Sequence, residues 1–107
     1  MAIARIWTCR SQTAKAEAYL QHFREKVLPA LDQIPGFLGA MLMRREDAGE
    51  VEYTVITRWI SLDSIKKFAG ADIDTAVVDP EIAAALTSYD KTVKHCEILE
   101  KVWSSTR

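Results

Sequence analysis

The alternation of residues in the segment 50–60, EVEYTVITRWI, constrains the fold more than any other feature of the sequence. Side chains two positions apart share one face of a strand. The predicted core face therefore carries Val51, Tyr53, Val55, Thr57 and Trp59. A second strand-like run, FLGAMLMRRE at 37–46, precedes it, and the Asp47-Ala48-Gly49 link is typical of a turn. The sequence thus predicts an antiparallel hairpin with one buried face.

Helical spacing flanks this hairpin on both sides. Before it, apolar residues recur at steps of three and four from Ala16 to Ile34, which predicts a helix over about 13–32. Pro29 is the one residue that disfavours this helix, because proline removes a backbone hydrogen bond. After the hairpin, Ser61 can cap a shorter helix that stops near Gly70. The Asp79-Pro80 pair is a further start signal and predicts a helix over 81–89.

Two more strands complete the pattern, at 2–9 and at 92–103, with the latter expected at least through Leu99. The order β-α-β-β-α-β, with an extra short helix before the last strand, predicts an α+β ferredoxin-like split sandwich. We expect one domain over 1–107, with its core at about 2–100 and a tail at 101–107. Helices would cover one sheet face, so the bare face predicts a homodimer. Ile6, Ile56 and Leu42 are the candidates for that face.

Composition excludes several classes of partner. The chain has 14 Lys and Arg against 15 Asp and Glu, which leaves no basic surface for nucleic acid or anionic membrane. No run approaches the roughly 18 apolar residues of a membrane span. Cys9 and Cys96 form no metal pattern, and no phosphate loop appears. We therefore expect a reduced, cytoplasmic protein with no metal and no cofactor.

Four segments together resemble a known family: ARIW, IPGFLGAMLMRRE, TRWISLDSIKKFAG and TVKHCEIL. They are similar to the antibiotic-biosynthesis-monooxygenase-type (ABM) domain of the dimeric α+β barrel superfamily. The most specific part is the strand-final Trp59 with Phe68 nine residues later. The resemblance implies a dimer whose sheets pack face to face, and a ligand site between the sheet and the helices. It also implies either cofactor-independent oxidation of phenols or anthrones to quinones, or the binding and degradation of haem.

The catalytic asparagine of both branches has no counterpart, because the chain contains no asparagine. Val55 occupies its position in the quinone-forming branch, and residues 60–80 lack the histidine of the haem-degrading branch. Of the functional residues of the two branches, only the tryptophan has a counterpart in this sequence, Trp59. Three functions therefore stay open: an oxygenase of a small aromatic molecule, a non-catalytic ligand-binding or stress-related dimer, and a haem-binding protein.

His95 is the candidate catalytic base. On the last strand, beside the first, it would lie near Arg5 or Trp7. Burial and a neighbouring cation both favour a neutral imidazole, which could accept a proton from a phenolic substrate. A hydrogen bond to the backbone or to Glu97 would explain the same residue without catalysis. His95 is also the one candidate for a haem ligand, because His22 is expected at the surface.

The candidate ligand-binding residues are Arg5, Trp7, Tyr53, Trp59 and Phe68. Arg5 could anchor an acidic or phenolic ligand, or could pair with a carboxylate such as Glu97 or Glu52. The aromatic residues could wall a cleft for a flat ligand or form an ordinary core. We expect Phe68 and Tyr53 to be mainly core residues and Trp59 to serve both purposes.

Overall fold

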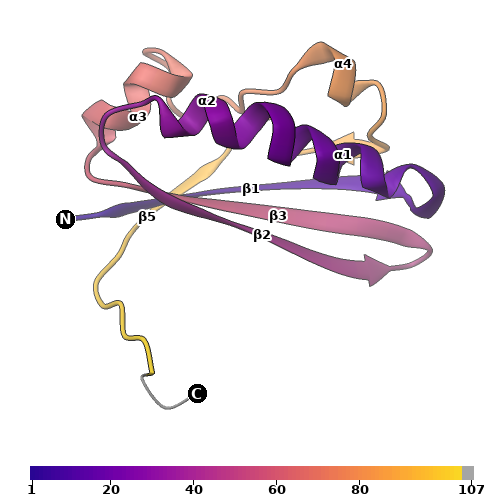
Figure 1. Ribbon diagram of the computed structural model, residues 1–107, viewed down its shortest axis with the longest axis horizontal. Helices are drawn as coiled ribbons and strands as arrows, with labels where there is room; N and C mark the ends of the chain where they lie inside the picture. The colour runs from indigo at the N-terminus through magenta and orange to yellow at the C-terminus, as the bar shows by residue number, and fades with distance from the viewer. Residues whose placement is uncertain (105–107) are drawn as a thin grey trace.

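An antiparallel sheet forms one layer of the molecule, and the helices lie on one of its faces (Figure 1). The computed structural model describes residues 1–104. The strands run in the order β2 (Phe37–Asp47), β3 (Glu50–Trp59), β1 (Ile3–Gln12), and both β4 (Ser88–Tyr89) and β5 (Lys94–Glu97) pair with the far edge of β1. The helical segments are η1 (Thr13–Lys15), α1 (Ala16–His22), η2 (Phe23–Val27), α2 (Leu28–Asp32), α3 (Leu62–Ala69) and α4 (Pro80–Ala83). The predicted α+β ferredoxin-like fold is confirmed.

The hairpin buries the face that its alternation predicts. Val51, Tyr53, Val55, Thr57 and Trp59 are each at most 7% exposed. The turn is tighter than expected, because Asp47 pairs with Glu50 and only Ala48 and Gly49 form the loop. Both loop residues have positive φ, 53° and 80°, which suits the twist of a two-residue hairpin turn.

The first helical stretch covers 13–32 as predicted, but it is not uniform. The segment η2 is a π-helical turn directly before α2, which contains Pro29. Proline has no N–H to donate to the carbonyl of Glu25, four residues earlier, and its ring crowds that carbonyl. A local π turn accommodates this loss. The stretch still buries Ala16, Tyr19, Phe23 and Leu31 against the sheet.

The predicted helix over 81–89 is wrong in its second half. The helix α4 ends at Ala83, and Ser88–Tyr89 forms the strand β4 on the edge of β1. The amides of Thr87 and Asp90 donate to the carbonyls of Arg10 and Thr8, at 2.8 and 3.0 Å. These amides thus find hydrogen-bond acceptors on the edge of β1, so the segment does not need to continue as a helix to pair them.

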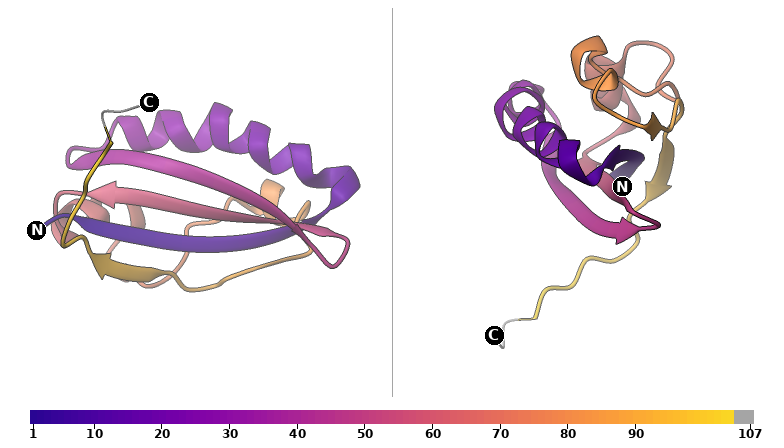
Figure 2. Two further views of the ribbon diagram at one scale, coloured as in Figure 1. Left: turned by 90° about the horizontal axis from the view of Figure 1, so that it is seen from below. Right: turned by 90° about the vertical axis from the view of Figure 1, so that its right-hand side faces the viewer.

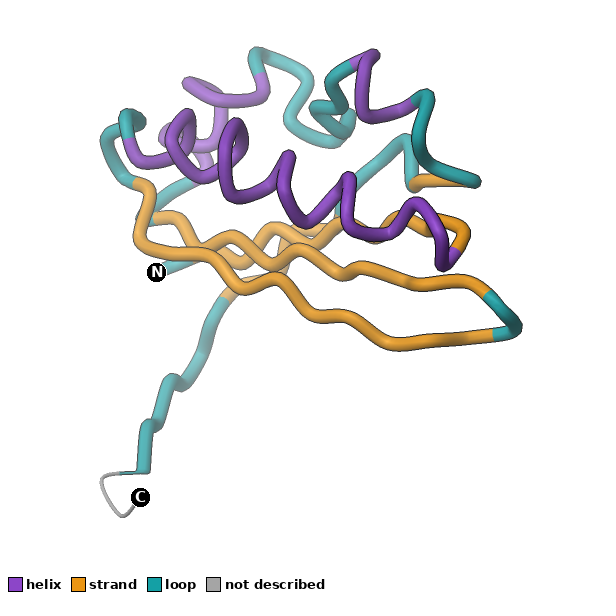
Figure 3. Tube along the Cα trace, turned by 45° about the vertical axis from the view of Figure 1, so that its right-hand side comes forward, coloured by secondary structure: helices purple, strands orange, loops and turns teal. Residues whose placement is uncertain are grey.

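The last strand is shorter than the predicted 92–103. It ends at Glu97, which pairs with Ile3 at the start of β1, so that no further strand residue is available as a partner. The following segment leaves the sheet on the side away from the helices (Figure 3). Leu99, Val102 and Trp103 in this segment are 71–83% exposed.

The helices leave one face of the sheet uncovered, as Figure 2 shows from below. Ile6 and Ile56 lie opposite each other on this open face, and Met41 pairs with Ile56 beside them. The expectation for Leu42 is wrong, because Leu42 pairs with Val55 and therefore packs on the helix side. A register shift between Phe37 and Gly39 decides which side chains of β2 face the helices and which face the open side. The sequence did not reveal this shift.

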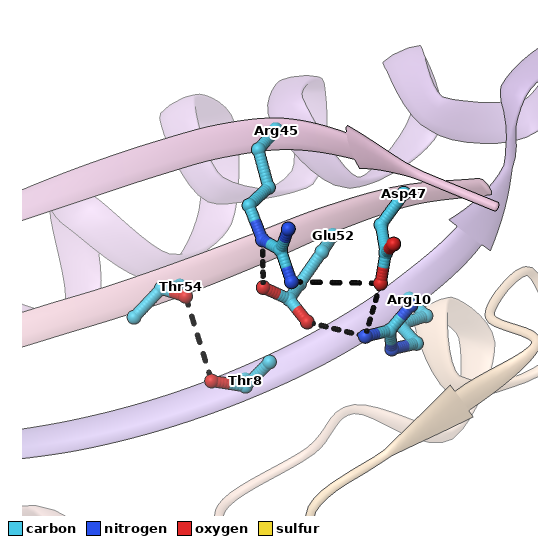
Figure 4. Close-up of polar contacts among 6 residues, drawn as sticks. All are labelled: Thr8, Arg10, Arg45, Asp47, Glu52 and Thr54. Carbon is cyan, nitrogen blue, oxygen red and sulfur yellow. Dashed lines mark hydrogen bonds and ion pairs between the residues drawn. The ribbon is translucent and has the colours of Figure 1, made fainter. Parts of the chain in front are cut away.

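Charged side chains join the three long strands at the hairpin end of the open face (Figure 4). Arg10 donates to Glu52 at 2.6 Å and to Asp47 at 3.1 Å. Arg45 donates to Glu52 at 2.8 Å and lies 3.5 Å from Asp47.

In the part of the chain that the structure covers, no helix has the length and apolar character needed to cross a membrane.

Candidate functional site

A narrow cavity of about 60 Å³ lies between the helices and the sheet. Its floor comes from β1 and β3, and its sides come from α1, α2, α3 and the segment that leads into α4. The residues that line it are Arg5, Trp7, Tyr19, His22, Val27, Leu31, Val55, Thr57, Phe68, Val77, Val78, Asp79, Ile82 and Val93. Because the sites of small-molecule ligands commonly measure about 300 Å³ or more, the cavity has to widen to admit a substrate.

Arg5 lies on the floor of this cavity and is only 5% exposed. Its guanidinium donates from Nη1 to the carbonyl oxygen of Ile73 and from Nη2 to that of Thr75, at 3.0 Å for the latter. It also lies over the ring of Phe68, 5.9 Å from the ring centre. Burial lowers the pKa of Arg5 and Asp74 opposes this shift, but a guanidinium remains charged in proteins. The alternative in which Arg5 pairs with Glu97 or Glu52 is not realised among the described residues, where Glu52 pairs with Arg10 and Arg45.

His95 lies beside Arg5, because β5 and β1 place the two residues opposite each other. The Nε2 atom of His95 is 2.9 Å from Nη1 of Arg5, and Nδ1 is 3.5 Å from Oδ1 of Asp74. A guanidinium can only donate, so the hydrogen-bond network assigns the proton of the neutral ring to Nδ1. Burial, and then the charge of Arg5, lower the pKa of His95, whereas Asp74 raises it. The neutral imidazole expected from the sequence is therefore favoured.

The position of His95 bears on the role predicted for it as a base. His95 is not among the residues that line the cavity, whereas Arg5, whose Nη1 atom lies 2.9 Å from Nε2 of His95, is among them. The acceptor nitrogen of His95 already has a partner. For His95 to take a proton from a ligand, Arg5 must first release Nε2.

The aromatic residues divide between the cavity and the core. Trp7 and Phe68 line the cavity. Tyr53 and Trp59 do not; they are 1% and 0% exposed and pack in the core on either side of the cavity floor, on the same face of β3 as Val55 and Thr57. The hydroxyl of Tyr53 donates to the carbonyl of Ala16 at 2.8 Å. The indole ring of Trp59 lies between Phe37 and Phe68, with ring centres 5.4 and 5.9 Å away.

Sequence reasoning missed four polar residues that line the cavity: Tyr19, His22, Thr57 and Asp79. His22 was expected at the surface, but it is half-buried and lines the cavity beside Tyr19. The sequence did contain a signal for this position. His22 is adjacent to Phe23 and three residues after Tyr19, so helical spacing places it at the border of the apolar stripe that faces the sheet. Thr57 could have been noticed as the one small polar residue on the buried face of β3.

The cysteines do not contribute a site. Cys9 is buried, and burial raises the pKa of its thiol to about 12. Cys96 is exposed, and both thiols are free. A raised pKa suppresses the reactive thiolate form of Cys9, which makes it a core residue rather than a nucleophile.

The family model for antibiotic biosynthesis monooxygenases matches residues 1–78. The chain belongs to this family. The resemblance inferred from the sequence is thereby confirmed. No curated protein matches the sequence significantly.

Several solved structures share the fold. A candidate antibiotic biosynthesis monooxygenase from Bacillus cereus is 13% identical, with full coverage of both chains and a TM-score of 0.68. The haem degrader MhuD of Mycobacterium tuberculosis, solved with two haems in its active site, is 25% identical over 94% of this chain and 99% of its own, with a TM-score of 0.60. SnoaB, a cofactor-independent oxygenase from Streptomyces nogalater, solved as an asparagine-to-alanine mutant, is 17% identical over 94% and 96%, with a TM-score of 0.64.

Proposed function

We propose that this ABM-family protein is an oxygenase of a small aromatic molecule of the phenol, anthrone or hydroquinone type. It would act without a metal or a tightly held cofactor; SnoaB, which shares the fold, is a cofactor-independent oxygenase. The observation that carries the proposal is a buried cation, Arg5, at the floor of a cavity whose walls include Trp7 and Phe68. Aromatic walls with few polar groups suit a flat ligand, and the guanidinium suits its acidic oxygen.

The chemistry requires removal of a proton from the substrate. The resulting anion can give one electron to O₂, and the substrate radical and superoxide then combine to a peroxide anion. This anion takes the proton back from the base, and the hydroperoxide loses water to give a quinone. One oxygen atom of O₂ enters the product and the other leaves as water. Arg5 would stabilise the negative charge on the substrate oxygen, because a charge-assisted hydrogen bond strengthens as that charge develops.

We retain His95 as the proposed base, in a role that depends on Arg5. A phenolic oxygen that takes over the Arg5 N–H now directed at His95 would leave Nε2 free to accept a proton. Asp74, on the other side of the ring, would stabilise the resulting imidazolium. Binding of the substrate by Arg5 would then be coupled to removal of the substrate's proton by His95.

Oxygen uptake by chelator-treated protein with an anthrone tests the proposal. We expect quinone to form in step with the O₂ consumed. His95→Gln should lower the turnover about 100-fold or more, the usual contribution of a general base. Lys94→Gln is the matched control and should leave turnover unchanged, because Lys94 is the exposed neighbour of His95 on β5 and does not line the cavity. Absence of uptake across a panel of anthrones, hydroquinones and phenols would sink the oxygenase proposal, and binding without uptake would leave the non-catalytic ligand-binding function.

Haem fits the cavity less well than a small phenol does. A porphyrin is much larger than the present volume of about 60 Å³. Both ring nitrogens of His95 face protein groups, and His22 is the histidine that lines the wall. We therefore derive no step through haem. A Soret band that persists in His95→Ala but is lost in His22→Ala would show that haem nevertheless enters at the α1 side.

We also propose a homodimer through the open face of the sheet. Met41 and Met43 are 48% and 45% exposed there, and Trp103 lines a shallow pocket with Met41, Ile56 and Arg58. The Nε atom of Arg58 is buried without a hydrogen-bond partner among the described residues. A second copy would cover this apolar surface and could supply an acceptor to Arg58. The free thiols suit a reducing compartment, and on that ground we propose a cytoplasmic location.

A further inference from the structure

We propose that Thr57 and Arg5 together form a binding site for an ionised oxygen, and that Trp59 holds Thr57 in position. The site would select planar aromatic anions, phenolates above all, over neutral aromatic molecules of the same shape. This inference rests on the proposed function for the location of the ligand and narrows the class of molecule that binds there.

The strand register brings the two side chains together. Arg5 on β1 lies directly opposite Thr57 on β3, and both point to the helix side of the sheet. Side chains that face each other across neighbouring strands lie about 5 Å apart at Cβ. The two residues are 5% and 6% exposed and share the floor of the cavity. Both side chains therefore border one cavity, and the proposed ligand oxygen would lie between their donors.

The hydroxyl of Thr57 has a proton to donate. Its Oγ1 atom accepts a hydrogen bond from Nε1 of Trp59 at 2.8 Å. The described residues offer no acceptor for the hydroxyl proton, which leaves it available to a ligand. The indole is wholly buried between two aromatic rings, so its N–H fixes the oxygen of Thr57 from the neighbouring position on the same strand face. Trp59 is thus a positioning residue that acts through Thr57.

Arg5 also has N–H groups that find no acceptor within residues 1–104. A guanidinium has five N–H groups, and the contacts with Ile73, Thr75 and His95 use three of them. The N–H on Nε and one on Nη2 have no partner among the described residues. With the hydroxyl of Thr57, this gives three free donors and a positive charge at one end of the cavity. Asp79, the carboxylate in the wall, accepts from the amide of Glu81 at the start of α4, at 2.9 Å.

A dye titration separates this site from a merely apolar pocket. The probe is 4-nitrophenol, whose phenolate absorbs visible light whereas the neutral phenol does not. We expect the wild-type protein to bind the phenolate at least about tenfold more tightly than 4-nitroanisole, which has the same ring and no ionisable oxygen. We also expect bound 4-nitrophenol to ionise at a lower pH than the free dye.

Substitutions at Thr57 test the assigned donor. Thr57→Val keeps the shape and removes the hydroxyl, and we expect about a tenfold loss of phenolate affinity with little change for 4-nitroanisole. Thr57→Ser, which retains the hydroxyl, should restore most of the affinity. Trp59→Phe should weaken phenolate binding by a smaller factor, because it frees the hydroxyl without removing it. Thr54→Val is the matched control, on the same strand but the opposite face, and should change nothing.

The outcomes are distinct from those of the oxygenase test. Phenolate binding that depends on Thr57, without oxygen uptake by any substrate, would support this site and contradict the oxygenase. Oxygen uptake with equal affinity for 4-nitrophenol and 4-nitroanisole would overturn this site and leave the oxygenase. Failure to bind 4-nitrophenol, or full phenolate affinity in a folded Thr57→Val, would also overturn it.

Discussion

Several buried polar side chains have a specific partner in this small core. Arg5 contacts two carbonyls and His95, the hydroxyl of Thr57 accepts from Trp59, and the hydroxyl of Tyr53 donates to Ala16. A buried polar group without a partner is costly, so these pairs restrict which side chains the positions tolerate. They also show why an alternation pattern alone cannot separate a core residue from a site residue: both are buried on the same face.

Tyr53→Phe should destabilise the protein by about 1 kcal/mol, because it leaves the carbonyl of Ala16 without its buried donor. Urea denaturation measures this difference. Tyr89→Phe is the control, since Tyr89 is 36% exposed and the structure gives its hydroxyl no partner. Equal stabilities of the two variants would contradict the role given to the Tyr53 hydroxyl.

The protonation of His95 should make the protein less stable in acid. The folded state lowers the pKa of His95 below its ordinary 6.5, so the unfolded chain binds the proton more readily. Stability is therefore complete above pH 6.5 and falls as the pH drops toward the folded-state pKa. In His95→Gln, where the amide oxygen can still accept from Arg5, this part of the acid loss should disappear. Parallel stability curves for both proteins between about pH 7.5 and about 5 would contradict the assignment.

Local backbone rules account for most of the elements. Ser61 caps α3 and Gly70 ends it, as the sequence predicts. The structure adds that Ser64 completes a reciprocal capping box with Ser61. The hairpin and the first helical stretch also lie where their periodicity predicts them. The short elements after residue 80 could not be placed, because β4 exists only through the edge of β1, a contact distant in the sequence. The end of β5 could not be predicted either, because it is set by the pairing of β5 with the start of β1.

Gly36 is the tightest point between β2 and α3. Its φ is +94°, and a Cβ atom there would lie 2.4 Å from Cβ of Ser64. Gly49, in the hairpin turn, has a φ of +80° but open space around it. Gly49→Ala should therefore cost about 1–2 kcal/mol from backbone strain alone. Gly36→Ala adds a clash and should cost about 3 kcal/mol or more, as thermal or urea unfolding would show. A smaller loss for Gly36→Ala than for Gly49→Ala would be inconsistent with this packing.

At the scale of the whole molecule, the sheet separates two surfaces with different roles. The helix side holds the cavity, and the open side offers apolar residues to a second copy. The sequence predicted both the fold and the bare face. It did not show which aromatic residues reach the cavity, since that depends on the register of β2 and on how the segment 71–79 crosses over Arg5. Neither feature has a local signature.

A charge on the open face should disrupt the dimer. Met41→Glu places a carboxylate at the centre of the proposed interface, and we expect a monomer at micromolar concentration by sedimentation, with an unchanged fold. Leu62→Glu is the matched control, because Leu62 is 45% exposed, close to the 48% of Met41, but lies on α3. A wild-type monomer, or dissociation by Leu62→Glu alone, would contradict the proposed interface.

The most direct test of the central claim is to locate the ligand by NMR of labelled methyl groups during a titration with 4-nitrophenol. Methyls of Val55, Thr57, Val78 and Val93 line the cavity, whereas those of Ile6, Met41 and Ile56 lie on the open face. The account predicts that the first set shifts and saturates while the second stays unchanged. Shifts confined to the open face, or none at all, would show that the cavity around Arg5 and Thr57 is not the binding site.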